Sequence, residues 1–213
     1  MKKTDPSATS EQQPLKNIAQ NSQRGRQNVE AKLIQSACAL LAERGPRAVS
    51  IRDIATHAGV NHGQIHHYFG GKKGLITAAI RHMANEHAEH AIQRGLDEHD
   101  APPPLSLGKD KQYIMSVIRT VLDGELELAT IEIEDDISVP RHVLEKLTKQ
   151  LGYRKPTLEI KSAMAASLSI ELAWAALAPY ILKMIDAKPD QVAKIEKFVG
   201  DTARNVIDQL ETK

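Results

Sequence analysis

The sequence has little of what disulfide-bonded, exported or multi-cysteine metal proteins require. It contains one cysteine, Cys38, so it cannot form an intramolecular disulfide or a multi-cysteine metal site. Cys38 falls on the apolar side of a predicted helix, where we favour a small buried side chain over a reactive thiol. No N-terminal stretch has the basic-then-apolar layout of a secretory signal, and we therefore expect a cytoplasmic protein.

Signals for strands and for catalytic loops are scarce as well. Neither β-branched alternation nor Asn-Gly turns appear, whereas apolar residues recur at three- and four-residue steps. We therefore predict an all-α fold. The sequence lacks a Gly-rich phosphate loop, a nucleophile elbow and a paired metal motif, so an enzyme is disfavoured and neither a cofactor nor a metal is predicted.

The charge that is present is distributed unevenly. The net charge is +1, yet residues 24–73 hold eight Lys and Arg against three acids. The remainder of the chain, from residue 74 onward, is acidic. A basic region near the N-terminus followed by an acidic remainder favours a polyanion-binding site at that end of the protein.

Apolar periodicity divides the chain into three parts. Residues 1–23 are polar and are predicted to form a disordered tail. Residues 24–75 are predicted to be a DNA-binding domain, and residues 76–213 a larger helical domain. In the first domain we expect a helix from about Arg26 to Gly45-Pro46, a second from Ser50 and a third after Asn61. The later helices are expected at about 72–96, then, after a Pro-rich break at 97–108, at 110–122, 124–136, 140–151, 156–186 and 190–211.

Residues 51–69 have the spacing of a helix-turn-helix. Ser50 and Asp53 form a predicted capping box, and Asn61 stands where the following helix needs a cap. Ala55 is small enough for the close helix contact, and Gly59 suits a turn with positive φ. The apolar residues that lock this corner are Ile54, Ala58, Val60 and Ile65. A helical hairpin of an unrelated bundle would share these apolar positions, but not the exposed donors of the second helix, namely His62, Gln64, His66, His67 and Tyr68.

The run from Arg26 to Leu75 resembles the DNA-binding domain of the TetR/AcrR regulators. The resemblance rests on an AERG turn, on the segment IRDIATHAGVNHGQIHHYFGGKKGL and on the long helix after it, about a quarter of the chain. Three positions depart from the family pattern. Asn61 replaces the usual Ser and keeps a cap, Lys73 replaces a common acid, and His66 stands where the family has a Tyr.

The resemblance implies a regulator that binds a palindromic DNA operator. It implies contacts with base edges by Arg52, His62, Gln64 and His66, and with phosphates by Ser50, His67, Tyr68 and Lys72. Packing against the first helix is the alternative for Tyr68, and plain solvent exposure is the alternative for His67. The implied function is a repressor released by a small-molecule effector, with a constitutive regulator or an activator as the alternative.

The resemblance also implies a homodimer with an effector pocket in each larger domain. Residues 163–182 are apolar on nearly every face, which by itself indicates a helix buried on two sides, and Glu171 and Pro179 argue against a membrane span. Glu171 needs a partner in so apolar a stretch, and we expect a ligand, Arg119 or Tyr113. The candidate pocket residues, for each of which ordinary core packing is the favoured alternative, are Tyr113, Ile114, Met164, Glu171, Trp174 and Tyr180.

Two further groups of side chains invite other interpretations. The acidic residues between 125 and 136 would suit a cationic effector, although a solvated helix face is the interpretation we favour. His82, Glu86 and His90 lie at four-residue steps and have metal-ligand chemistry, which leaves a metal-dependent helical enzyme as the disfavoured function from another class.

Overall fold

The computed structural model describes the backbone of residues 12–94 and 110–210, and the side chains of these residues from Gly25 onward. All regular structure in this part of the chain is helical, so the predicted all-α fold is confirmed. The break predicted at 97–108 lies outside the described residues. The helices are α1 (Gln12–Ala48), α2 (Ile51–Ala58), α3 (Gly63–Phe69), α4 (Lys72–Gln93), α5 (Lys111–Leu122), α6 (Leu126–Ala129), α7 (Ile131–Glu134), α8 (Val139–Gln150), α9 (Leu158–Met184) and α10 (Val192–Asp208).

The first helix differs from its prediction at one end and agrees with it at the other. Helical backbone begins at Gln12, inside the segment that we expected to be a disordered tail. Gln, Leu, Lys and Ala in this segment are good helix formers, so local propensity supports a helix that hydrophobic periodicity does not mark. At the other end, Gly45 has φ 78° and ψ 166°, which breaks the helix at the predicted Gly45-Pro46 position.

The single helix predicted at 124–136 is wrong. Gly124 adopts a positive φ of 78°, and two one-turn helices, α6 and α7, follow instead. They are separated at Thr130, whose φ and ψ are −104° and 16°. The Thr130 hydroxyl donates to the Leu126 carbonyl oxygen at 3.0 Å, a side-chain bond that competes with continuation of the backbone ladder.

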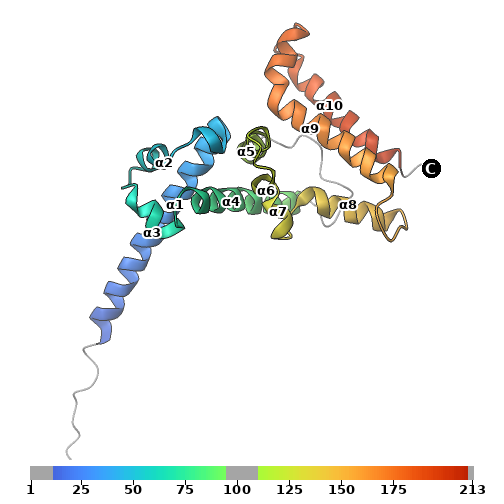
Figure 1. Cartoon of the computed structure of the whole chain (residues 1–213). Helices are drawn as coiled ribbons and strands as arrows, with labels where there is room; N and C mark the ends of the chain where they lie inside the picture. The colour runs from blue at the N-terminus through green and yellow to red at the C-terminus, as the bar shows by residue number, and fades with distance from the viewer. Residues whose placement is uncertain (1–11, 95–109, 211–213) are drawn as a thin grey trace, which may run out of the picture.

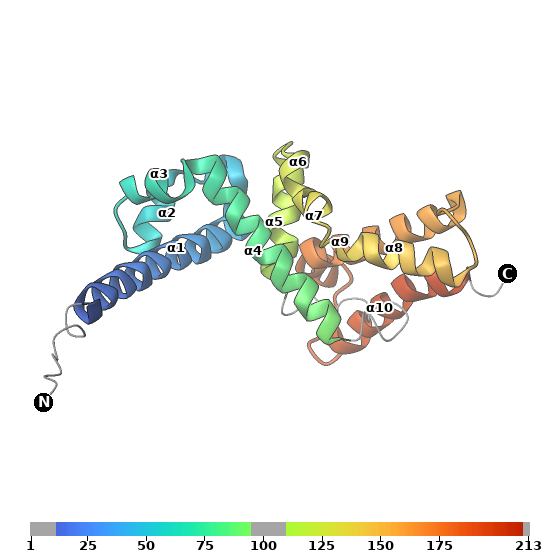
Figure 2. The ribbon, with the colours of Figure 1, turned by 90° about the horizontal axis from the view of Figure 1, so that it is seen from below.

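Two hydrophobic clusters organise the molecule. The larger one joins α1–α4 to α5 and α7, and includes Leu33, Ile54, Ile65, Ile80 and Ile114. It continues across the domain boundary expected after residue 75, because α4 contributes to it from Leu75 to Ala84. The smaller cluster joins the end of α4 to α8, α9 and the end of α10. Consequently α4 crosses from the small helices at one end of the molecule to the larger domain at the other (Figures 1 and 2).

The last two long helices lie side by side and leave apolar surface uncovered. Helix α9 packs against α10, α5 and α8 (Figure 1). By length and composition alone α9 is also apolar enough to cross a membrane. Several large apolar side chains of this pair are at least half exposed in the single chain, namely Leu177, Tyr180, Met184, Ile185 and Phe198. Large apolar side chains exposed together on one pair of helices are typical of a surface that binds another protein.

Candidate nucleic-acid interface

The capping box predicted at the start of α2 is present. Ser50 N donates to Asp53 Oδ2 at 2.8 Å, and Asp53 N donates to Ser50 Oγ at 3.1 Å. These bonds from the Ser50 hydroxyl and backbone hold the pKa of Asp53 below its usual value. Two orphan donors of the helix terminus are thereby satisfied, and the direction in which α2 begins is fixed.

The turn between α2 and α3 has the geometry predicted for it. Gly59 has φ 66° and ψ 34°, a left-handed conformation that ends α2, and its N–H bonds to the carbonyl oxygens of Ala55 and Thr56. Ala55 is 4% exposed, as expected of the small residue where the helices approach each other. Asn61 Oδ1 accepts from Gly63 N at 2.8 Å, so its predicted capping role is confirmed.

Helix α3 presents polar side chains outward from this corner. Ile65 is fully buried and anchors the helix, whereas His62, His66 and His67 are exposed. Gln64 is half-buried, and its side-chain oxygen is inaccessible and has no hydrogen-bond partner among the residues that the structure describes. An unpaired buried oxygen is costly, so this amide gains if it turns toward a donor outside the protein.

The remaining predicted contact residues surround α3. Arg52 is exposed on α2, and Lys72 is the half-buried first residue of α4. A methyl group added at Gly71 would lie 3.6 Å from His66 Nδ1, which places the His66 ring beside the start of α4. Ser50 is exposed, but its hydroxyl donates to Asp53 Oδ2 at 2.5 Å as well as accepting from Asp53 N. A phosphate contact by Ser50 would therefore compete with the cap.

Tyr68 lies where either of the two interpretations left open by the sequence is compatible with its position. Its ring packs against the larger hydrophobic cluster, and it also lies at the surface beside His67, with ring centroids 4.9 Å apart. The guanidinium carbon of Arg26 lies 5.3 Å from the Tyr68 ring centroid. Arg26 was not among the predicted contact residues, because its place beside α3 depends on how α1 crosses that helix.

Helix α5 forms polar contacts with neighbouring helices at both of its ends, and those at its C-terminal end reach the DNA-binding helices. At its C-terminal end, Asp123 Oδ2 accepts from Arg47 N at 2.9 Å, and Arg119 Nε donates to the Ala42 carbonyl oxygen at 2.8 Å. Both bonds reach the part of α1 on either side of the Gly45 break. These two bonds fix the C-terminal end of α5 against the end of α1.

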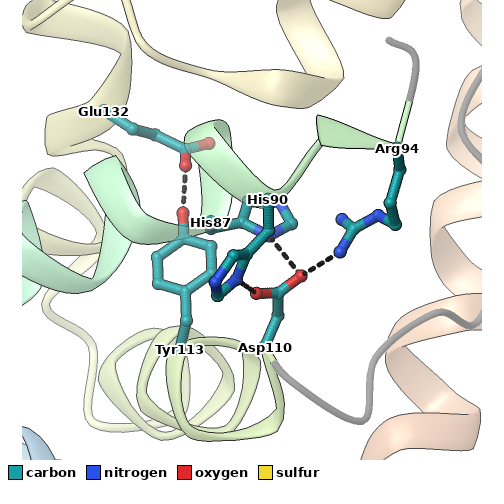
Figure 3. Close-up of polar contacts among 6 residues, drawn as sticks. All are labelled: His87, His90, Arg94, Asp110, Tyr113 and Glu132. Carbon is teal, nitrogen blue, oxygen red and sulfur yellow. Dashed lines mark hydrogen bonds and ion pairs between the residues drawn. The ribbon is translucent and has the colours of Figure 1, made fainter. Parts of the chain in front are cut away.

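At its N-terminal end, α5 meets the end of α4 through a buried carboxylate (Figure 3). The side chain of Asp110 is 2% exposed, and it lies 2.6 Å from His90 Nδ1, 3.1 Å from Arg94 NH1 and 3.1 Å from His87 Nδ1. The His90 and Arg94 contacts have hydrogen-bond geometry, whereas His87 Nδ1 is close without it. Burial raises the pKa of Asp110, but the histidine contacts and the arginine charge outweigh burial and hold this pKa below its usual value.

A tyrosine extends this network to α7 and α8. The Tyr113 hydroxyl donates to Glu132 in a short hydrogen bond (Figure 3). Ser138 Oγ donates to the other Glu132 oxygen at 2.8 Å. Burial, together with the Glu132 charge, raises the pKa of Tyr113, so its hydroxyl keeps the proton that it donates. The His87 ring stacks on the Tyr113 ring with centroids 4.9 Å apart. Sequence patterns gave no signal for this junction, because its members are distant in the chain.

The predicted pocket residues do not gather at one place. Tyr113 and Ile114 belong to the larger cluster and Met164 to the smaller one, whereas Tyr180 is 65% exposed. Trp174 is buried on α9. Two of the partners expected for Glu171 are wrong, because Tyr113 bonds to Glu132 and Arg119 bonds to Ala42, whereas the third, a ligand, stays a prediction. Burial raises the pKa of Glu171, and a hydrogen bond from Ser167 offsets part of that effect.

The candidate metal ligands on α4 and the acidic residues between 125 and 136 also make different contacts from one another. Within the described residues, no cluster of three or more His, Cys, Asp or Glu has metal-binding geometry. His90 turns to Asp110, while His82 pairs with Glu86 at 3.5 Å on the exposed side of α4. The acidic stretch is not one solvated face, because Glu132 bonds to Tyr113 and Asp135 forms a two-point pair with Arg81. Its other acidic members, Glu125, Glu127, Glu134 and Asp136, are exposed.

The prediction for Cys38 agrees with the structure. Its side chain is 3% exposed, and burial raises the pKa of the thiol to about 12. The thiol therefore stays protonated and packs as a small apolar group.

Two short helices around a left-handed glycine, capped at both starts and braced by α1, define a helix-turn-helix DNA-binding domain. Residues 33–79 match the family model of the bacterial regulatory proteins of the tetR family. Over these residues the chain is similar to the DNA-binding domain of that family, as the sequence resemblance indicated.

Curated relatives agree over the same region. The HTH-type transcriptional repressor Rv3405c of Mycobacterium tuberculosis is 43% identical over 83 residues, which cover 35% of this chain and 44% of that protein. The HTH-type transcriptional regulator BetI of Brucella anthropi is 44% identical over 55 residues, or 26% of this chain and 28% of BetI. The chain thus matches less than half the length of these relatives.

Solved structures extend the likeness in fold to most of the chain. A tetR-family transcriptional regulator from Streptomyces coelicolor aligns with a TM-score of 0.52 and 18% identity, over 87% of this chain and 89% of that one. A structure titled as a putative TetR-family regulator from Rhodococcus sp. aligns with a TM-score of 0.60 and 13% identity, over 85% and 98%. At these identities the comparison establishes the fold of the larger domain and not its ligand.

Proposed function

We propose that this chain is a cytoplasmic transcriptional regulator that binds a palindromic DNA operator as a homodimer. The observation that carries the proposal is the capped helix-turn-helix with an exposed, donor-rich α3. A family match over residues 33–79 and regulators among the relatives support it. The same findings disfavour an enzyme.

Within this proposal, the exposed side of α3 enters the major groove. His62, Gln64 and His66 on and beside α3, with Arg52 on α2, are the proposed base contacts, and Gln64 has the paired donor and acceptor that suit adenine. Lys72, His67 and Tyr68 are the proposed phosphate contacts. Ser50 is also proposed as a phosphate contact, on the condition that its hydroxyl keeps its bonds to Asp53 in the helix cap.

The homodimer is proposed through α9 and α10. The apolar side chains that this pair leaves exposed would be covered by the same surface of a second copy, in the self-complementary way of a two-fold interface. A two-fold dimer presents its two α3 helices about one DNA turn apart, which matches a palindromic operator.

Repression with release by a small molecule is the finer part of the proposal. The relative Rv3405c carries the name of a repressor. An effector that binds better to a conformation unfit for DNA would draw the dimer off the operator. The proposed effector contacts are buried or partly buried residues of the larger domain, and because they are divided between two hydrophobic clusters a small effector would touch only some of them. They are Tyr113, Ile114, Met164, Glu171 and Trp174. Tyr180, being exposed, fits the dimer surface better.

The deciding experiment measures binding of the full chain to DNA from its own upstream region. Gel shift at nanomolar protein and footprinting should give a site with two symmetric halves. Metabolites and drugs are then screened for release of that site. Protection of a single asymmetric half-site would contradict the dimeric operator, and no binding to any upstream fragment would contradict the proposed function.

A further inference from the structure

Helix α1 reaches beyond the three-helix domain on the side where α3 ends (Figures 1 and 2). The family model begins at residue 33, so this portion of α1 lies outside the matched domain. From Gln12 to Val29 the sequence contains Lys16, Arg24 and Arg26 and no acidic residue. A helix segment with cations and few apolar residues suits a polyanion better than an apolar partner.

Arg26 connects this segment to α3. Its side chain is 58% exposed, and its guanidinium lies over the Tyr68 ring, which in turn meets the His67 ring edge-on at 62°. Arginine, tyrosine and imidazole therefore form one row of hydrogen-bond donors at the end of α3. Two of the three, His67 and Tyr68, are already proposed phosphate contacts.

The way Arg26 is held leaves it able to bind an anion. Its Nε donates to Glu30 Oε1 at 2.8 Å, one turn further along α1. A guanidinium has five N–H donors in a fixed plane, so the terminal nitrogens remain for a phosphate. The ring below and the carboxylate beside it restrict the side chain, which lowers the entropy lost when it binds.

We infer that Arg26 contacts a phosphate of the operator backbone at the outer flank of each half-site, beyond the bases that α3 faces. The inference rests on the proposed function and adds to it a contact outside the family domain. A phosphate contact carries no sequence information, so Arg26 strengthens binding to all DNA alike and fixes the position of α3 along the groove.

The test compares the full-length chain with Arg26→Gln across a salt series. Each neutralised phosphate adds about 0.9 to the slope of log affinity against log salt, so the variant should lose that amount. At about 0.1 M salt its affinity should fall about threefold to tenfold, equally for operator and random DNA. Arg26→Lys keeps the charge and should keep the slope. Arg141→Gln, at an exposed position of α8, is the matched control and should change nothing.

Hydroxyl-radical footprinting supplies a second measurement. The unaltered chain should protect backbone positions at both outer flanks, and Arg26→Gln should lose that protection while the central protection stays. An unchanged salt slope and an unchanged footprint would overturn the inference. This holds even if the affinity of Arg26→Gln falls, because loss of the Arg26 contact with Tyr68 lowers affinity without removing a phosphate contact. A change in dimer mass instead of the slope would mean that the segment binds protein. No DNA binding by the unaltered chain would refute the proposed function itself.

Discussion

At the scale of single residues, the side chains near α3 differ in what they already touch, and this predicts different losses. Gln64→Ala should cost roughly 1–3 kcal/mol of operator binding and relax the preference at one base pair. Lys72→Ala should weaken operator and random DNA equally and reduce the salt slope by about 1. Affinity measured for both DNAs at several salt concentrations separates the two. A uniform loss for Gln64→Ala would show that it does not read a base.

The buried carboxylate Asp110 predicts how stability depends on pH. Its folded-state pKa lies below the ordinary 3.8, so on acidification the unfolded chain takes up the proton first. The stabilisation from its ionised form is therefore complete above about pH 5 and is lost as the pH falls through the folded-state pKa. Asp110→Asn removes this part of the dependence, and denaturant unfolding at pH 3 to 7 should give a shallower pH profile for the variant.

Near neutral pH the same substitution should destabilise the fold. Asn keeps the shape but leaves the nearby Arg94 charge without its partner, at a cost on the order of 3 kcal/mol. Asp208→Asn, at an exposed site on α10, is the control and should stay within about 0.5 kcal/mol. Equal losses for both variants at pH 7, or parallel pH profiles, would contradict the role assigned to Asp110.

At the scale of elements, glycines at the two helix junctions predict a graded series. Gly59→Ala meets no atom within 4 Å but must keep φ +66°, which costs about 1–2 kcal/mol. Gly74→Ala would place its methyl carbon 1.9 Å from the Phe69 carbonyl oxygen, so α3 and α4 would have to separate. We expect Gly74→Ala to abolish operator binding and Gly59→Ala only to lower the unfolding temperature.

Gly25→Ala is the control for this series. It lies in α1 with nothing within 4 Å, and alanine there should stabilise the helix by roughly 0.5–1 kcal/mol. Circular dichroism melts and gel shifts of the three variants give the order. A Gly74→Ala protein that bound the operator normally would show that the approach of α4 to Phe69 is looser than the structure has it.

At the scale of the whole molecule, α9 and α10 predict the state of assembly. Phe198 is 72% exposed on α10, and Phe198→Glu would bury a charge in the proposed interface. The unaltered chain should have twice the 23.5 kDa mass of one copy at micromolar concentration, and the variant should shift toward a single copy. Gln112→Glu, exposed on α5 and outside the α9–α10 pair, has the same charge change and should leave the dimer intact. Light scattering that finds the unaltered chain monomeric would refute the dimer.

Local order and the DNA-binding corner could be read from the sequence by itself. The Ser50 and Asp53 box, the left-handed turn at Gly59 and the cap at Asn61 depend on neighbours within a few residues, and each was predicted at its position. The all-α class followed in the same way from apolar periodicity. The segment from Gln12 has helix-forming residues but no apolar periodicity, so its helix was not predicted and α1 begins earlier than expected.

Only the tertiary structure decided which distant side chains meet. It brought Asp110 to the end of α4, Arg119 to Ala42 and Arg26 to Tyr68. It also paired Tyr113 with Glu132 and not with Glu171. Such pairings depend on how helices cross, and a helix pattern specifies a buried face without naming its neighbour. The sequence thus determined most of the helices and the helix-turn-helix, while packing determined how the helix-turn-helix is joined to the rest of the chain.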